Sequence, residues 1–237
     1  MRVTIALPAY DEVESLERVV VEARAAIAAL GLEGEAEILV VDDGSTDGTG
    51  VLADRLAAAE TRAVHHAANR GFSGAMRTCF REARGDWVFL AAADGQTRIA
   101  ELARFLERSR GADIVVGVRA SRSEPLLRKV LSRGFHTMAR AVFALPEREF
   151  SSAFLFKRSL LDAMPFRSRP RSATLLPEIL FRARRRGARL ATLEVESRPR
   201  LAGRAKGGQL SVAALTFVEL LRLGVLLRID EARGVRR

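Results

Sequence analysis

The ten residues from Val40 to Thr49 decide the fold of this chain, and they read Val40-Val41-Asp42-Asp43-Gly44-Ser45-Thr46-Asp47-Gly48-Thr49. The apolar run over residues 38–41 is typical of a buried parallel strand, and a helix is predicted to begin near Asp47. The two carboxylates therefore stand at the carboxyl end of a strand, where open α/β sheets bind ligands. Ser, Thr and Asp also cap helices, so this stretch alone fits either a binding site or an ordinary strand-to-helix turn.

Strand and helix patterns alternate along the first half of the chain. Strands are predicted at residues 2–7, 36–42, 61–65, 86–91 and 113–118, and helices at residues 13–30, 48–59, 73–84 and 98–110. Such alternation indicates right-handed βαβ crossovers and a mostly parallel sheet. The first strand runs into Pro8-Ala9-Tyr10-Asp11-Glu12 and the fourth into Ala92-Ala93-Asp94-Gly95-Gln96. We therefore expect three strands to deliver acidic or polar loops to one edge of the sheet.

These loops together resemble the motifs of the family-2 glycosyltransferases of the GT-A fold, especially their polyprenyl-phosphate branch, of the dolichol-phosphate mannose type. Residues 8–12 are similar to Pro-Ala-Tyr-Asn-Glu, residues 41–49 to Val-Asp-Asp-Gly-Ser-x-Asp-x-Thr, and residues 92–96 to Asp-x-Asp-x-Gln. The resemblance extends from about Arg2 to Lys206. It implies a single α/β domain over residues 1–208, with a Rossmann-like, mostly parallel central sheet flanked by helices.

The second half of the chain is expected to complete this domain. Helices are predicted at residues 125–143 and 174–186, and strands at residues 152–157 and 188–195. Residues 209–237 form an amphipathic, basic helical tail in which Leu210, Ala214, Phe217, Leu221 and Val225 share a face at helical spacing. Three interpretations of this tail stay open: packing on the core, contact with a membrane interface, and contact with another subunit. Its charged residues argue against a membrane-spanning helix.

The resemblance implies a binding site for a nucleoside-diphosphate sugar, with either GDP or UDP as the nucleotide. Asp42 is expected to bind the base, while Asp43 and Ser45 shape the turn. The other residues implied in donor binding are Pro8, Ala9, Tyr10, Glu12, Asn69, Gly71, Asp94, Arg200 and Lys206. Asn69 and Gly71 belong to a glycine-rich segment before a helix, where backbone N–H groups can meet an anion. Arg200 and Lys206 belong to a basic loop that resembles Arg-x-x-Gly-x-Ser-Lys.

Asp11 stands where the family has asparagine, and two interpretations of it remain. It either faces the donor or acts as a helix N-cap, with Glu14 completing a capping box.

A divalent cation, Mg²⁺ or Mn²⁺, is implied by the Asp-x-Asp-x-Gln motif, with Asp94 and Gln96 as its ligands. Ala92 replaces the first aspartate. Because Mg²⁺ can be held by one carboxylate together with substrate phosphates, we expect a cation that is held weakly without nucleotide. Two alternatives are that arginines replace the metal and that the protein has lost its activity.

The resemblance further implies Asp94, Arg119 and Glu149 as catalytic residues. Arg128 and Arg133 are expected as cations for the acceptor, with solvated charge on a helix as their other interpretation. Arg119 ends a Gly-x-Arg segment, and Glu149 falls where the family has aspartate. Leu155 replaces a basic residue of the family, which puts acceptor recognition in doubt. Glu178 is an alternative acidic residue, with a solvated surface position as its other interpretation.

The expected reaction is an inverting transfer of a sugar from a nucleoside-diphosphate sugar to a polyprenyl-phosphate-type acceptor. A phosphate monoester is largely dianionic at neutral pH, so it needs no general base. A hydroxyl acceptor would need one, and Glu149 or Asp94 would serve. A further alternative is a catalytically degenerate, nucleotide-binding paralogue that acts as a partner subunit.

Composition bounds the partners of this chain. Its 39 basic and 29 acidic residues give a net charge of +10, and all of the basic residues except Lys129, Lys157 and Lys206 are arginines. Arginine favours phosphates and anionic lipid, but a single Trp and a single Tyr provide no stacking platform for nucleic acid, so none is expected. Cys79 is expected in the core and His65 and His66 in structural roles. No signal peptide is visible, which predicts a cytoplasmic enzyme, with a peripheral membrane contact and an oligomer left open.

Overall fold

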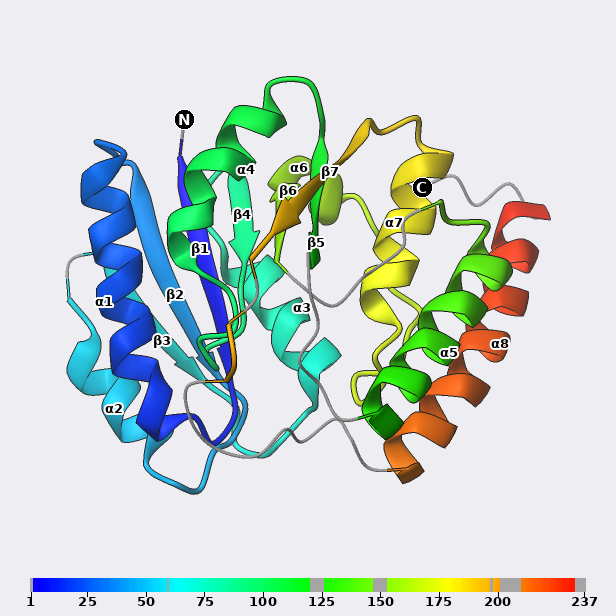
Figure 1. Cartoon of the computed structure of the whole chain (residues 1–237), viewed down its shortest axis with the longest axis horizontal. Coiled ribbons are helices and arrows are strands. Elements are labelled where there is room, and N and C mark those ends of the chain that lie inside the picture. The colour runs from blue at the N-terminus through cyan, green and yellow to red at the C-terminus, as the bar shows by residue number, and fades with distance from the viewer. Residues whose placement is uncertain are drawn as a thin grey trace.

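A seven-stranded sheet in the order β3-β2-β1-β4-β6-β5-β7 lies at the centre of the computed structural model (Figure 1). The strands are β1 (Val3–Ala9), β2 (Ala36–Asp42), β3 (Thr61–His65), β4 (Trp87–Leu90), β5 (Ile114–Arg119), β6 (Phe154–Lys157) and β7 (Leu190–Val195). All pairings are parallel except those that β6 makes with β4 and β5. Six strands therefore end at the same edge. The structure describes residues 2–58, 60–119, 126–146, 153–196, 198–200 and 210–232.

Helices cover both faces of the sheet. They are α1 (Val13–Ala29), α2 (Thr49–Leu56), α3 (Phe72–Glu82), the 3₁₀ turn η1 (Ile99–Glu101), α4 (Leu102–Ser109), α5 (Leu126–Phe143), α6 (Arg158–Asp162), α7 (Leu175–Arg185) and α8 (Leu210–Ala232). Side chains alternate across β1, so that Ile5 and Leu7 join the apolar cluster beneath α1 and α4 while Ala6 joins the cluster beneath α3 and α7. Burial on both faces explains why the strands are near-continuous apolar runs.

The predicted α/β fold is confirmed, and each predicted helix and strand is present within a few residues of its expected bounds. The antiparallel insertion of β6 between β4 and β5 was not foreseen, and neither was the short helix α6. Cys79 is buried in the core, as predicted, and burial raises the pKa of its thiol.

The tail helix α8 packs beside α5 on the right of Figure 1. Its buried side is formed by Leu220, Leu223 and Leu227, which belong to the same apolar cluster as α3 and α7. The interpretation that the tail packs on the core is therefore correct, but the face that was predicted to do so is not the inward one. Leu221 and Val225 point outward and are each 56% exposed. Among the described helices, none is both long enough and apolar enough to cross a bilayer.

Candidate functional site

The loops after β1, β2 and β4 meet at the carboxyl edge of the sheet. Ala9 is the register partner of Asp42, and the Asp43 N–H donates to the Ala9 carbonyl at 2.8 Å. On the other side of β1, the Ala93 N–H donates to the Pro8 carbonyl at 3.2 Å. Since neighbouring strands lie about 4.8 Å apart, the ends of β2 and β4 are separated by about 10 Å, with the end of β1 between them. The three loops that the sequence singled out therefore form one continuous surface.

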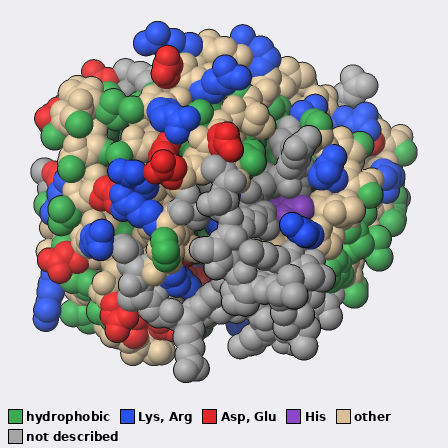
Figure 2. Space-filling model, in the orientation of Figure 1, with side chains coloured by type: hydrophobic (Ala, Val, Ile, Leu, Met, Phe, Trp, Pro, Cys, Tyr) green, Lys and Arg blue, Asp and Glu red, His purple; other side chains and the backbone are tan. Residues whose placement is uncertain are grey.

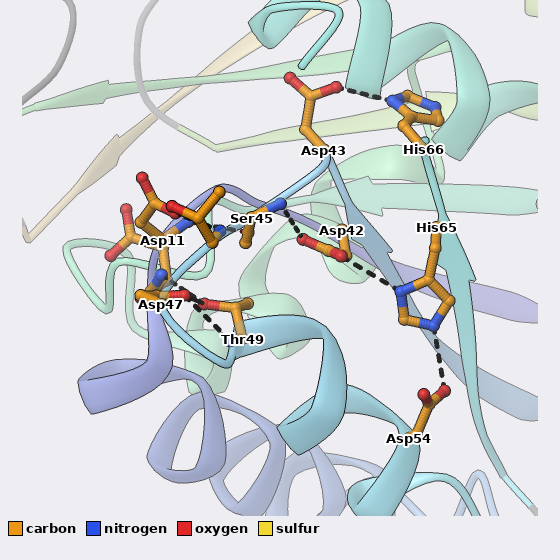
Figure 3. A network of polar contacts seen from close by, with 11 residues as sticks. Asp11, Asp42, Asp43, Ser45, Asp47, Thr49, Asp54, His65 and His66 are labelled. Atoms are coloured by element: carbon orange, nitrogen blue, oxygen red, sulfur yellow. Dashed lines mark hydrogen bonds and ion pairs between the residues drawn. The ribbon is translucent and has the colours of Figure 1, made fainter. Parts of the chain in front are cut away.

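Asp43 is buried and organises the turn rather than facing solvent (Figure 3). Its Oδ1 accepts from the Arg70 N–H at 2.8 Å and lies 2.6 Å from Nδ1 of His66, and its Oδ2 accepts from the Gly71 N–H at 2.8 Å. The Nε2 atom of His66 lies 2.8 Å from the Thr78 hydroxyl. The expected turn-shaping role of Asp43 and the structural role of His66 are thus confirmed, and together they fix the segment from Asn69 to Gly71 beside Asp42.

A glycine is required at position 44, where the turn after β2 packs against the backbone of Ala68 and Asn69. It has a φ of +71°, in the left-handed region, and a Cβ atom added to it would lie 2.6 Å from the Ala68 carbonyl carbon. A side chain at this position would clash, so glycine allows the loop after β2 to pack directly against the loop after β3.

Asp42 ends β2 and is held on two sides (Figure 3). Its Oδ1 accepts from the Ser45 N–H at 3.0 Å, and its Oδ2 lies 3.1 Å from Nδ1 of His65. The other ring nitrogen of His65, Nε2, lies 3.0 Å from Oδ1 of Asp54 on α2. Burial lowers the pKa of His65, but the hydrogen bonds to Asp42 and Asp54 outweigh it and raise the pKa above its ordinary value of 6.5. His65 therefore holds a carboxylate at this edge of the sheet, which agrees with the structural role expected of it.

Asp11 does not cap α1, because its side chain points to the neighbouring turn. It accepts from the Thr46 N–H at 2.9 Å, and its own N–H donates to the Ser45 hydroxyl at 2.9 Å. The residue at the N-cap of α1 is Glu12, whose side chain makes no capping hydrogen bond. The Val13 N–H instead donates to Asp47 at 3.1 Å. The capping-box interpretation is wrong, since the N-cap is Glu12 and the carboxylate of Asp47, from the loop after β2, accepts the N–H of the first helical residue.

Arg200 forms ion pairs with two carboxylates, Glu12 after β1 and Asp94 after β4. Glu12 and Asp94 are 8% and 13% exposed as side chains, and the guanidinium of Arg200 binds the Glu12 carboxylate directly and lies 3.5 Å from Oδ2 of Asp94. Ser15 supports the arrangement by donating to the Ala93 carbonyl at 2.8 Å. The guanidinium of Arg200 thus lies between two partly enclosed carboxylates, and the structure brings together three residues that the sequence resemblance assigns to donor binding.

The Asp94 loop offers a small set of metal donors. Oδ1 of Asp94 accepts from the Gln96 N–H at 3.0 Å, and the Gln96 carbonyl accepts from the Arg198 N–H at 3.0 Å. In the part of the chain that the structure describes, no three or more His, Cys, Asp or Glu side chains gather as a metal site. The residues present fit a cation held by one carboxylate and completed by ligand phosphates.

The other predicted residues are described only in part. Arg119 ends β5, beside Val195 of β7, and is separated from β4 by the inserted strand β6. Arg133 is exposed on α5, and Arg128 lies in the first turn of that helix, where side chains are not described. Glu149 and Lys206 lie outside the described residues.

Glu178 is neither a solvated residue nor a free acid. It is fully buried and accepts from the Arg167 and Ser168 N–H groups at 2.7 and 2.8 Å, and Nε of Arg182 donates to it at 2.9 Å. The carboxylate holds the loop before α7, which is a structural role.

Comparison with known proteins identifies the family. The model of glycosyl transferase family 2 matches residues 4–174. The glycosyltransferase AglD of Haloferax volcanii is 32% identical over 84% of this chain, which spans only 34% of that protein. The polyprenol monophosphomannose synthase of Mycolicibacterium smegmatis is 28% identical over 100% of this chain and 92% of its own length.

A solved structure has the same fold. It is the glucosyl-3-phosphoglycerate synthase of Mycobacterium tuberculosis in complex with Mn²⁺, UDP and glucosyl-3-phosphoglycerate, with a TM-score of 0.69 and 20% identity over 93% of this chain and 79% of that one. The seven-stranded sheet, the loops at its carboxyl edge and the family match agree. The chain belongs to glycosyl transferase family 2.

Proposed function

We propose that this protein transfers a sugar, with inversion, from a nucleoside-diphosphate sugar to a polyprenyl phosphate. The observation that carries the proposal is the bridge of Arg200 between Glu12 and Asp94, beside Asp42 at the carboxyl edge of the sheet. An arginine there can exchange its carboxylate partners for a diphosphate, which it binds in a bidentate manner. The similarity to a polyprenol monophosphomannose synthase over nearly its full length supports the lipid-phosphate acceptor.

The donor would lie across the ends of β2, β1 and β4. Asp42 accepts an N–H of the base, and the wall of Pro8, Ala9, Tyr10 and Glu12 encloses the base and ribose. The segment from Asn69 to Gly71, which Asp43 fixes, faces the donor from the side of β3. Arg200 and Lys206 bind the diphosphate from the loop that follows β7.

A divalent cation would be held by Asp94 and Gln96 together with the donor phosphates. When bound, it supplies a Lewis acid that neutralises the leaving diphosphate. To take part, Asp94 exchanges its contact with Arg200 for the cation, and the arginine exchanges that contact for a donor phosphate. With one carboxylate in place of two, the cation is held weakly until nucleotide binds.

The acceptor phosphate attacks the anomeric carbon from the side opposite the leaving group. A phosphate oxygen forms the new bond to carbon, and the bond to the diphosphate breaks with its electron pair going to the nucleoside diphosphate. Arg119, Arg128 and Arg133 attract the acceptor phosphate, and no proton has to be removed from it. Glu149 or Asp94 would act as a base only if the acceptor were a hydroxyl.

We expect the reaction to take place at the cytoplasmic face of a membrane, on which the outward face of α8 lies. This face comprises Leu215, Val218, Leu221, Val225 and Ile229, which are 39–68% exposed, and it accounts for most of the large exposed apolar side chains described. The acids in the described part of α8 are all paired with arginines: Glu219 with Arg169 and Arg222, Asp230 with Arg167 and Arg182, and Glu231 with Arg185. Figure 2 shows apolar and basic side chains along the right-hand edge, where α8 lies.

An anionic lipid surface fits this face better than a second copy of the chain. Apolar side chains flanked by arginine enter the head-group region of a bilayer, whereas two copies would bring like charges together. The test is sedimentation with vesicles of phosphatidylcholine alone or mixed with phosphatidylglycerol. The double variant V218E/V225E is expected to lose binding to the anionic vesicles, while V21E and V51E, at exposed positions on α1 and α2, bind as the wild type does. A dimer that the double variant abolishes, without any vesicle binding, would overturn the membrane assignment.

Calorimetric titration with UDP and with GDP, each with Mn²⁺ and with a chelator, tests the donor site. We expect micromolar binding of one nucleotide that is weakened by chelation, and weakened to a similar extent in D94N. Binding that chelation leaves unchanged would favour arginine in place of metal. Binding of neither nucleotide would reject the donor site and favour a degenerate paralogue.

A further inference from the structure

The pairing of His65 with two carboxylates has a consequence for the base-binding residue. Parallel pairing of β2 with β3 makes Asp42 and His65 register partners, and α2 brings Asp54 to the far side of the imidazole. Three elements therefore contribute one residue each to a chain of two hydrogen bonds, drawn in Figure 3. Asp42 is 5% exposed, and a Cβ atom added to Gly50 of α2 would lie 2.7 Å from its Oδ2. The Oδ2 atom is thus enclosed by His65 and Gly50, while Oδ1 accepts from the Ser45 N–H at 3.0 Å and keeps a second lone pair for a ligand.

Both nitrogens of His65 face a carboxylate oxygen, at 3.1 and 3.0 Å. A neutral imidazole carries one N–H and can donate to only one of them, which leaves a lone pair turned toward the other carboxylate. The imidazolium donates to both. Asp42 and Asp54 are the charged groups in contact with His65 among the described residues, and His66 points to Asp43 on the other side. This geometry selects the charged form, in agreement with the raised pKa of His65.

We propose that His65 is a positioning residue for Asp42, and that nucleotide affinity falls when His65 loses its proton. This inference rests on the proposed donor site. Two effects act in the same direction. The imidazolium fixes the orientation of the Asp42 carboxylate, and its charge offsets the repulsion between the anionic nucleotide and the acidic residues of this edge. Asp54 contacts neither Asp42 nor the proposed path of the donor, so its effect would pass through His65 alone.

The test is nucleotide affinity measured by calorimetry from pH 6 to 9, at saturating Mn²⁺, in the wild type and in H65Q, D54N and E60Q. In the wild type, affinity is expected to fall by about three- to tenfold as pH rises through the pKa of His65. H65Q is expected to bind weakly throughout and to lose this step. D54N keeps the step but moves it to lower pH, because His65 has lost one of the partners that raise its pKa. E60Q removes a carboxylate that pairs with Arg24 and is expected to behave as the wild type does.

The nucleotide's own terminal phosphate also titrates near pH 6. Because that titration is common to all four proteins, the difference between the wild type and H65Q isolates His65. Titration of the His65 ring by NMR provides the same midpoint independently, and thermal melts confirm that each variant is folded. A wild-type affinity without a step, or a midpoint that D54N does not move, would overturn the inference. Absence of nucleotide binding by the wild type at every pH would instead overturn the proposed function.

Discussion

Asp43 is the residue on which the shape of the site depends most. Its carboxylate accepts two backbone N–H groups and contacts His66 while almost fully buried. Asn in its place presents one N–H₂ group to a donor and leaves that donor unsatisfied. D43N should therefore lower the free energy of unfolding by about 1–3 kcal/mol, as measured by urea denaturation. The ion pair between Glu60 and Arg24 at the surface offers a control, since E60Q should change the free energy of unfolding by less than about 0.5 kcal/mol. Equal effects of the two variants would contradict the role of Asp43.

Ala92 is one of the residues at which this chain departs from the motifs that it resembles, since it replaces the first aspartate of Asp-x-Asp-x-Gln. It lies two positions before Asp94 and is partly exposed on the same loop. A carboxylate there would give the cation a second protein ligand, so A92D should tighten Mn²⁺ binding in the presence of nucleotide by about tenfold or more. Calorimetric titration of Mn²⁺ into the nucleotide complex measures this, with A92N as the uncharged control. Unchanged Mn²⁺ affinity in A92D would argue against Asp94 as a ligand.

At the scale of elements, the approach of α2 to the end of β2 depends on a glycine. A Cβ atom on Gly50 would collide with Oδ2 of Asp42 at 2.7 Å and would touch Nδ1 of His65 at 3.4 Å. Alanine favours a helix by about 1 kcal/mol over glycine, yet here it must push α2 or the carboxylate aside. G50A should therefore weaken nucleotide binding by about tenfold without stabilising the protein. G111A, where an added Cβ meets nothing within 4 Å, should leave binding unchanged. Wild-type affinity in G50A would show that Asp42 is not held as described.

The sequence predicts the helices and strands well, but it predicts poorly which strands pair and which distant side chains come into contact. Alternating strand and helix patterns identify the sheet because βαβ units are local and right-handed. The insertion of β6 depends on pairing between distant segments, which a local pattern does not encode. Likewise, Arg200 and Glu12 are 188 positions apart, and only the family resemblance suggested that both serve the donor. The contact of His65 with Asp42 could not be predicted from the sequence, because it depends on the register between β2 and β3.

At the scale of the whole molecule, carboxylates that accept hydrogen bonds in the folded state predict sensitivity to acid. The Arg189 N–H lowers the pKa of Asp113, which joins β5 to β6 and β7, below its ordinary value of 3.8. Burial raises the pKa of Asp47, but hydrogen bonds from Thr49 and Val13 outweigh it and lower the pKa overall. A carboxylate whose pKa is lowered by folding stabilises the fold at pH values above its pKa in the unfolded state. This stabilisation is lost as pH falls through its pKa in the folded state.

Stability should therefore drop below about pH 4, and D113N should show a smaller drop than the wild type. Thermal melts between pH 2 and 6 measure both. Because Asp47 and Asp113 share no partner, the losses in D47N and D113N should add. A D113N variant whose stability falls with acid as steeply as that of the wild type would contradict the assignment.

The measurement that tests the central claim most directly is sugar transfer by the purified protein to a polyprenyl phosphate, compared with the corresponding polyprenol. UDP- and GDP-linked sugars are supplied with Mn²⁺, and the lipid product is separated and quantified. We predict transfer to the phosphate and none to the alcohol, with loss of product in D94N. Transfer to the alcohol would contradict the phosphate acceptor. Nucleotide binding without any transfer would contradict catalysis itself and favour a partner subunit.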